Sequence, residues 1–232
     1  MRYDDTARWI FDSPVFMTWQ NSSQSQGLCC RGIPGSGKSI LAASVVNFCM
    51  QYASRDGVVC LYHYCDYAEM TTLNPRQAVG SLLKQTIIKG IPANLEERIF
   101  QVCDNGYKDQ DVDSLSSLLK DALEAFEVAY IAIDGLDECL PEDAHKMLGL
   151  LEGLLTLDKP AIKALVTCRD EDLVAGLTTE YLQIRFTETS LAADLSIFVQ
   201  RAVDGAITQK RLKRPGMRDE IISQLTSKAH GM

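Results

Sequence analysis

Residues 32–39 have the types and spacing of a site that holds phosphate. They read Gly-Ile-Pro-Gly-Ser-Gly-Lys-Ser, the pattern G-x-x-x-x-G-K-S of a phosphate-binding loop. Its glycines let the backbone turn sharply and present successive N–H groups to a phosphate. We expect Lys38 to contact the β- and γ-phosphates and the Ser39 hydroxyl to bind Mg²⁺. The predicted nucleotide-binding residues are Gly32, Ile33, Pro34, Gly35, Ser36, Gly37, Lys38, Ser39 and Ile40.

Three acidic residues form a second group of candidates. Asp134 ends an apolar run, where its carboxylate could bind the Mg²⁺ held by Ser39. Asp137 and Glu138 follow closely, and either could orient or deprotonate an attacking water, with Glu138 the favoured base. The alternative is structural: the two acids cap the helix that begins at Pro141, or they pair with Arg169.

Arg169 follows another apolar run and completes the candidate set. A guanidinium group there could sense the terminal phosphate and stabilise charge during its transfer. The alternative is a surface ion pair with Asp170 or Glu171. The predicted catalytic residues are therefore Lys38, Asp137, Glu138 and Arg169, and the predicted metal ligands are Ser39 and Asp134.

Apolar runs separated by helical patterns indicate an α/β fold. Strands are expected at 28–31, 58–64, 128–134, 162–167 and 181–186. Helices are expected at 40–50, 75–89, 93–102, 113–126 and 141–155, with caps at Asn74 and at Asp113-Ser114. This alternation predicts a doubly wound, parallel, five-stranded sheet flanked by helices, as in P-loop NTPases. Ligands then bind at the carboxyl ends of the strands.

The chain divides into three predicted parts. Residues 1–26 form an aromatic lead-in, which either packs on the domain edge or forms a wall beside a nucleotide base. Residues 27–189 form the P-loop core. Residues 190–232 form a small helical segment, expected to be the truncated start of a longer helical or winged-helix region. Its basic residues are either a solvated loop or a contact to another subunit or an anionic partner: Lys210, Arg211, Lys213 and Arg214.

Composition limits the classes of function. The net charge of −8 over 232 residues argues against a general nucleic-acid-binding surface. The N-terminus lacks a signal peptide, and no apolar stretch comes near the roughly 18 residues of a membrane span, so we expect a cytoplasmic protein. None of the eight cysteines forms a C-x-x-C pair, which favours buried, reduced thiols over a metal site.

Three segments together resemble the NACHT family of the STAND class of signalling NTPases, the class of the NOD-like receptors. They are G-I-P-G-S-G-K-S, I-A-I-D-G-L-D-E-C and L-V-T-C-R. The lead-in, with Trp9, Phe16 and Trp19, and the ending Lys228-Ala229-His230-Gly231-Met232 are most similar to the fungal branch. By position, the resemblance implies that Asp134 is the Walker B aspartate. Asp137 and Glu138 are then the extended acidic motif and Arg169 the sensor arginine, with Cys168 where the family commonly has serine.

The resemblance also implies a function. Such proteins are nucleotide-driven switches, so we expect ATP or GTP with Mg²⁺, slow hydrolysis, and self-association on activation. An upstream effector region and downstream repeats are implied as partners and lie outside this sequence. Two alternatives stay open: a module that holds nucleotide without hydrolysing it, and a kinase or transferase on the same fold. The choice between ATP and GTP is also open, because the absence of an N-K-x-D motif excludes only one way of recognising guanine.

Overall fold

The computed structural model describes residues 7–104, 110–169, 181–209, 211 and 215–229. Its centre is a five-stranded sheet with the strand order β2-β3-β4-β1-β5, in which every neighbouring pair is parallel. The strands are β1 (Gln26–Arg31), β2 (Val58–Tyr64), β3 (Val128–Asp134), β4 (Ala161–Cys168) and β5 (Tyr181–Arg185). The predicted fold class is therefore confirmed.

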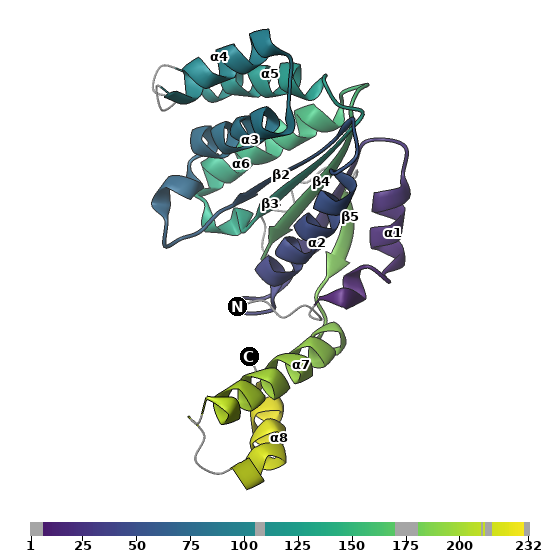
Figure 1. Cartoon of the computed structure of the whole chain (residues 1–232), viewed down its shortest axis with the longest axis vertical. Coiled ribbons are helices and arrows are strands. Elements are labelled where there is room, and N and C mark those ends of the chain that lie inside the picture. The colour runs from purple at the N-terminus through teal and green to yellow at the C-terminus, as the bar shows by residue number, and fades with distance from the viewer. Residues whose placement is uncertain (1–6, 105–109, 170–180, 210, 212–214, 230–232) are drawn as a thin grey trace.

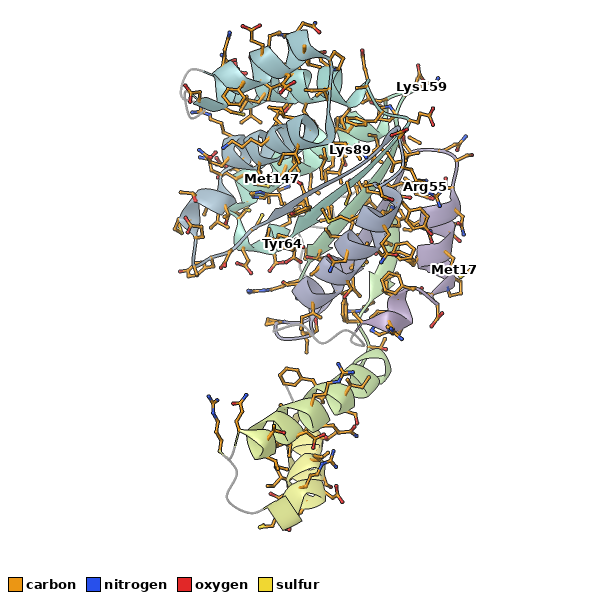
Figure 2. The ribbon with its side chains drawn as sticks, viewed as in Figure 1. Met17, Arg55, Tyr64, Lys89, Met147 and Lys159 are labelled. Atoms are coloured by element: carbon orange, nitrogen blue, oxygen red, sulfur yellow. The ribbon has the colours of Figure 1, made fainter. Side chains whose placement is uncertain are left out.

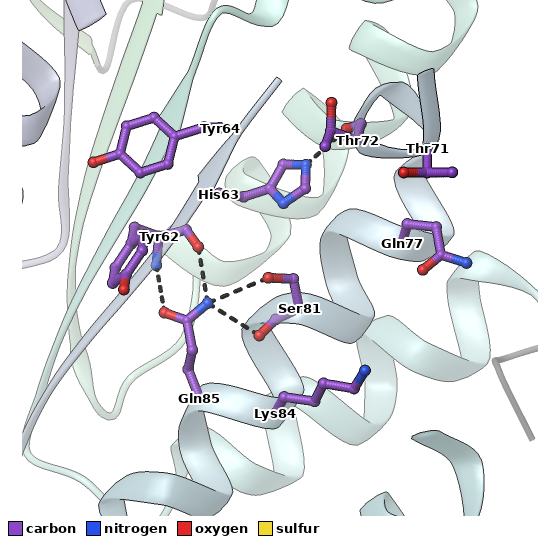
Figure 3. Close-up of a pocket in the computed structure, with 9 residues that line it drawn as sticks. All are labelled: Tyr62, His63, Tyr64, Thr71, Thr72, Gln77, Ser81, Lys84 and Gln85. Carbon is purple, nitrogen blue, oxygen red and sulfur yellow. Dashed lines mark hydrogen bonds between the residues drawn. The ribbon is translucent and has the colours of Figure 1, made fainter. Parts of the chain in front are cut away.

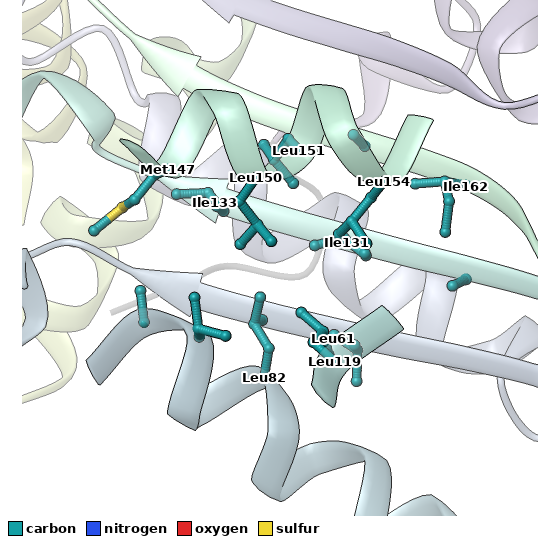
Figure 4. Packing of buried hydrophobic residues seen from close by; sticks show 14 of the residues in the cluster. Leu61, Leu82, Leu119, Ile131, Ile133, Met147, Leu150, Leu151, Leu154 and Ile162 are labelled. Carbon is teal, nitrogen blue, oxygen red and sulfur yellow. The ribbon is translucent and has the colours of Figure 1, made fainter. Parts of the chain in front are cut away.

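Helices cover both faces of this sheet (Figure 1). On one face, α3 (Pro75–Lys89) and α6 (Pro141–Leu155) lie against the strands, and α4 (Ala93–Asp104) and α5 (Val112–Leu123) pack on α3. The core beneath them is aliphatic and includes Leu82 of α3, Ile131 of β3 and Leu151 of α6 (Figure 4). Because both faces are covered, the central strands are continuous apolar runs, which is why the sequence showed them so clearly.

The opposite face carries α2 (Lys38–Tyr52), α1 (Pro14–Asn21) and the short 3₁₀ turn η1 (Arg8–Ile10). Pro14 is the first residue of α1, so the aromatic lead-in is two short elements, as the proline predicts. Phe16 and Trp19 are buried on this face, and the Trp19 Nε1–H lies within hydrogen-bonding distance of the Gln26 and Ala164 carbonyl oxygens. Most of the lead-in thus packs on the edge of the domain.

One predicted helix start is wrong. The cap of α5 is Asp111, whose carboxylate accepts a hydrogen bond from the Ser114 N–H at 2.6 Å, and the helix ends at Leu123 rather than Phe126. Asp113 lies inside the first turn. Asp111 and Asp113 are both suitable capping residues by type. Which of them precedes the first helical residue depends on the backbone conformation, which the sequence pattern does not specify. The predicted cap at Asn74 is confirmed, because its side chain accepts from the Arg76 N–H.

After β5 the chain is helical, with α7 (Glu188–Thr208), the 3₁₀ turn η5 (Pro215–Met217) and α8 (Arg218–Ala229). The two helices pack on each other, and Arg218 forms a bidentate ion pair with Asp204. Of the basic residues predicted in this segment, Arg211 is exposed, whereas Lys210, Lys213 and Arg214 lie outside the described residues. The three-part division of the chain stays a prediction.

The thiols behave as the sequence predicts. Seven of the eight cysteines are buried, Cys103 is partly buried, and none is in a disulfide. The Sγ atoms of Cys29 and Cys168 lie 3.7 Å apart between β1 and β4. Across the ranges given above, no helix is long and apolar enough to cross a membrane.

Candidate functional site

The phosphate-binding loop joins β1 to α2, and its glycines are required by two different constraints. Gly35 and Gly37 have φ angles of 78° and 83°, a left-handed conformation that side chains disfavour. At Gly32 the constraint is space, since an added Cβ would lie 2.7 Å from Ser36 Oγ and 2.9 Å from the Cβ of Phe186. The local sequence therefore produces a tight loop that opens toward the start of α2.

Lys38 is held by the loop to which it belongs. Its Nζ donates to the carbonyl oxygens of Gly32 at 2.7 Å and Ile33 at 3.0 Å. Burial lowers the pKa of Lys38, and nearby Asp137 opposes that shift. Two backbone carbonyl oxygens thus hold the ammonium group at the loop. A bound phosphate could replace these oxygens as its hydrogen-bond acceptor.

Ser36 gives a test of whether the loop suits a phosphate. Its side chain is only 5% exposed, and its Oγ has no hydrogen-bond partner within the described part of the chain. A buried hydroxyl without a partner costs about 1–3 kcal/mol, and a phosphate oxygen could accept from it. The loop therefore fits an anionic, oxygen-rich group.

Asp134 is the last residue of β3 and is buried, with only 4% of the residue exposed. Burial raises its pKa, while hydrogen bonds from the Thr167 and Ser39 hydroxyls and the charge of Lys38 oppose that shift. Thr167 Oγ1 donates to Asp134 Oδ1 and also accepts from the Gly135 N–H at 2.9 Å. Ser39 and Asp134 thus supply adjacent oxygens, which suits a hard cation such as Mg²⁺.

Asp137 and Arg169 form a two-point contact. Arg169 Nε lies 2.8 Å from Asp137 Oδ2, and the Arg169 N–H donates to Asp137 Oδ1 at 3.0 Å. The sequence left open that Asp137 pairs with Arg169, and the structure contains this pair. The residues Asp170 and Glu171, considered as other partners of Arg169, lie outside the described residues.

Glu138 is held by a different segment. Its Oε2 accepts from the Tyr67 N–H at 2.6 Å, which ties it to the loop after β2. Neither acidic residue caps α6, because the cap position is Leu140 and no side chain bonds there. The other carboxylate oxygen of Glu138, Oε1, has no hydrogen-bond partner among the described residues and could contact a water.

These side chains converge on one cavity of about 290 Å³ at the carboxyl ends of the strands. Figure 2 shows Tyr64 at this end of β2 and Lys159 at the opposite end of the sheet. Most predicted site residues line the cavity, and Gly32, Ile33, Pro34 and Ser36 form the loop behind it. The lining is Gly35, Gly37, Lys38, Ser39, Ile40, Asp134, Gly135, Asp137, Glu138, Thr167 and Arg169.

Sequence reasoning missed two groups at this site, Thr167 and the backbone of Tyr67. Thr167 precedes Arg169 by two residues, so the end of β4 could have suggested it. Tyr67 carried no signal, because its contribution is a main-chain N–H.

A parallel sheet in this order, with a phosphate-binding loop after β1, defines the P-loop NTPase fold. Within that class the sequence matches the family described as nephrocystin 3, N-terminal, over residues 5–169, and the chain belongs to this family. No curated protein matches the chain. The similarity to the NACHT family and its fungal branch stays a prediction.

Three solved structures have a similar fold. The Orc1 protein of Aeropyrum pernix, solved in complex with DNA, has a TM-score of 0.55 at 16% identity and covers 82% of this chain and 47% of its own. Cdc6p from Pyrobaculum aerophilum has a TM-score of 0.51 at 14% identity, covering 81% and 46%. Drosophila ORC bound to DNA has a TM-score of 0.50 at 16% identity, covering 87% and 48%. The chain spans about half the length of these proteins, and the likeness shows the fold.

Proposed function

We propose that this chain is the nucleotide-binding part of a switch protein, which binds ATP or GTP with Mg²⁺ and hydrolyses it slowly. One observation carries the proposal. The phosphate-binding loop, the stretch from Asp134 to Glu138, and Arg169 are three separate segments of the chain, and residues from all three line a single cavity. If each residue served only as a helix cap or a surface ion pair, nothing would require them all to line the same cavity.

Each residue has a role in this proposal. The loop N–H groups and Lys38 bind the β- and γ-phosphates, and Ser39 and Asp134 hold Mg²⁺, which neutralises phosphate charge when bound. Glu138 accepts a proton from the attacking water. Arg169 contacts the terminal phosphate after its guanidinium leaves Asp137, whose role is then to position the arginine.

Slow turnover suits a switch, because the two nucleotide states must persist long enough to favour different conformations. The resemblance to the NACHT family supports this use of the site and also self-association on activation. The predicted lack of a nucleic-acid partner stays a prediction resting on net charge alone, since two of the structures with this fold were solved with DNA.

Removing the loop lysine tests nucleotide binding. Lys38→Ala should abolish Mg²⁺-dependent binding of ATP or GTP in isothermal titration calorimetry, because no other cation is bonded to the loop in the described structure. Lys146→Ala is the matched control, since Lys146 is an exposed lysine of α6 paired only at the surface with Asp143. Unchanged affinity in Lys38→Ala would overturn the proposal.

Hydrolysis is tested separately. Glu138→Gln keeps an acceptor for the Tyr67 N–H but cannot accept a proton, so phosphate release should fall by about 100-fold or more while nucleotide affinity persists. Glu142→Gln, an exposed position in the first turn of α6, should hydrolyse normally. Equal turnover in Glu138→Gln and the parent would show that Glu138 is not the base.

A second candidate is a module that holds nucleotide and does not hydrolyse it. The contacts of Glu138 with Tyr67 and of Arg169 with Asp137 favour it, because both catalytic candidates are already engaged. The same assay distinguishes the two. The module predicts binding that depends on Lys38, with no phosphate release by the parent chain.

A further inference from the structure

Among the residues that the structure describes, no aromatic side chain lines the phosphate cavity. We therefore look for the base-binding surface among the described residues next to this lining. A nucleobase presents a flat π-face, for which aromatic side chains are the strongest non-specific partners. Aromatic residues next to the phosphate-binding loop are therefore candidates for this surface.

Two aromatic residues, Phe186 and Trp9, lie beside Gly32, the first glycine of the loop. Phe186 follows β5, and its N–H donates to the Arg31 carbonyl at 2.8 Å, which extends the β1–β5 pairing up to the loop. Its Cβ fills the space that a side chain at Gly32 would need. Trp9, from η1, packs edge-on against Phe186 with ring centroids 5.5 Å apart and an interplanar angle of 87°.

This pair is more exposed than the two buried aromatic residues of α1, and Phe11, which is also partly buried, stacks on Phe48 of α2 instead. Phe16 and Trp19 are 0% and 1% exposed and belong to the core, whereas Trp9 and Phe186 are only partly buried. Ala7, the buried residue just before the turn that carries Trp9, has a left-handed backbone conformation with a φ of 61°. Backbone of this kind is commonly found where a chain is shaped around a ligand.

Tyr67, the most exposed of the aromatic residues that the structure describes, lies at the wrong end of the cavity. Tyr67 is 75% exposed, but its N–H bonds to Glu138, the residue proposed to act at the terminal phosphate. A base is joined to the opposite end of the triphosphate. Tyr67 is therefore not placed to stack on the base.

We propose that Trp9 and Phe186 form the surface on which the purine base of the bound nucleotide stacks. The pair recognises the face of the ring rather than its hydrogen-bonding edge, so adenine and guanine are accepted alike. This inference rests on the proposed function, because it requires that the loop hold the phosphates.

The experiment compares three ligands of the full chain in the presence of Mg²⁺: ATP, GTP and inorganic tripolyphosphate, which has no base. Trp9→Ala should weaken ATP and GTP binding by about 5- to 150-fold, the range expected for one lost stacking contact, and leave tripolyphosphate affinity unchanged. Trp9→Phe keeps a ring and should retain most of the affinity. Phe100→Ala, at an exposed aromatic position of α4 outside the site, is the control and should alter none of the three affinities.

Fluorescence gives a second readout that does not depend on how well Trp9→Ala folds. The chain has two tryptophans. ATP and GTP should change the emission of the parent protein, and the change should disappear in Trp9→Phe, where only buried Trp19 is left. Tripolyphosphate should leave the emission unaltered.

The outcomes separate this inference from the proposed function. If all three ligands bind and depend on Lys38, but Trp9→Ala affects them equally or not at all, base stacking on Trp9 is wrong and the phosphate site stands. A strong preference for ATP over GTP that survives Trp9→Ala would also overturn it. If none of the three binds, the proposed function fails and this inference fails with it.

Discussion

The Thr167 hydroxyl joins two strands at the point where the metal is proposed to bind. It is fully buried, donates to Asp134 on β3 and accepts from the Gly135 N–H. It thereby favours the ionised carboxylate and opposes the effect of burial on the pKa of Asp134.

Thr167→Val should therefore impair both stability and metal binding. It leaves the Gly135 N–H without an acceptor, which should lower the free energy of unfolding by about 1–3 kcal/mol. It also raises the pKa of Asp134 further, so protons compete with Mg²⁺ and nucleotide affinity should fall most at the acidic end of a pH series. Thr167→Ser keeps the hydroxyl and should resemble the parent in denaturant unfolding and in calorimetry. Equal behaviour of the two variants would contradict this role.

Asp137 and Arg169 should act as one unit. If Asp137 only positions the arginine, then Asp137→Asn, Arg169→Ala and the double variant should all lower phosphate release by a similar factor, about 10- to 100-fold. A double-mutant cycle on turnover measures this coupling. Additive losses would mean that Asp137 has its own role in the chemistry.

The sequence identified most side chains of the site but not their partners. Gly32–Ser39 and Asp134 could be predicted because motif and strand are local patterns. The contacts of Asp134 with Thr167, Asp137 with Arg169 and Glu138 with Tyr67 join different strands or loops. They depend on strand order and register, which no local pattern specifies.

At the scale of elements, β2 is an edge strand whose outer side is partly closed by a side chain. Gln85 of α3 accepts from the Tyr62 N–H at 3.0 Å and donates to the Tyr62 carbonyl at 2.8 Å, much as a neighbouring strand would (Figure 3). It lies at the base of a pocket of about 470 Å³ between β2 and α3. An open edge promotes pairing with other chains, and this amide blocks part of it.

Gln85→Leu should destabilise the chain and promote association. Two polar groups of Tyr62 lose their partner, so we expect a loss of about 1–3 kcal/mol in the free energy of unfolding and concentration-dependent growth in light scattering. Gln77→Leu on the same helix is the matched control, since Gln77 is exposed. Equal scattering by the two variants would contradict a protective role of Gln85.

Element boundaries show what local patterns can and cannot provide. The bounds of α3, β2 and β3 match the prediction because proline, asparagine and unbroken apolar runs mark their ends. The sequence did not predict the 3₁₀ turn η3 (Leu136–Glu138), although this turn carries both acidic residues, Asp137 and Glu138. Three residues are too few for a periodic pattern, and Gly135 at φ 73° is what starts it.

At the scale of the molecule, a buried lysine links stability to pH. Lys163 on β4 is 2% exposed, its Nζ donates to the Gln24 carbonyl at 2.7 Å, and it forms no ion pair among the residues described here. Burial lowers its pKa from 10.5 to about 8. Between these two values the unfolded chain binds a proton that the folded chain does not. Rising pH therefore favours the folded state over this interval, whereas below pH 8 the cost of the buried charge is fully present.

Comparison with Lys163→Met isolates this effect from the thiols and tyrosines that both proteins share. The free energy of unfolding of the parent, relative to Lys163→Met, should increase by about 2 kcal/mol between pH 7 and pH 9.5. Chemical denaturation at the two pH values measures it. A difference that does not change with pH would mean that Lys163 keeps an ordinary pKa in the folded protein.

The sheet divides the interior into two packed regions that share few side chains. Along β1, Cys29 belongs to the aliphatic region under α3 and α6, while Leu28 and Cys30 belong to the aromatic region under α1 and α2. Substitutions on opposite faces should then add in their effects on folding, whereas those on one face should interact. Over evolutionary time, one side of the molecule could be remodelled for new contacts while the other, which carries α2 and the phosphate-binding loop, stays under separate selection.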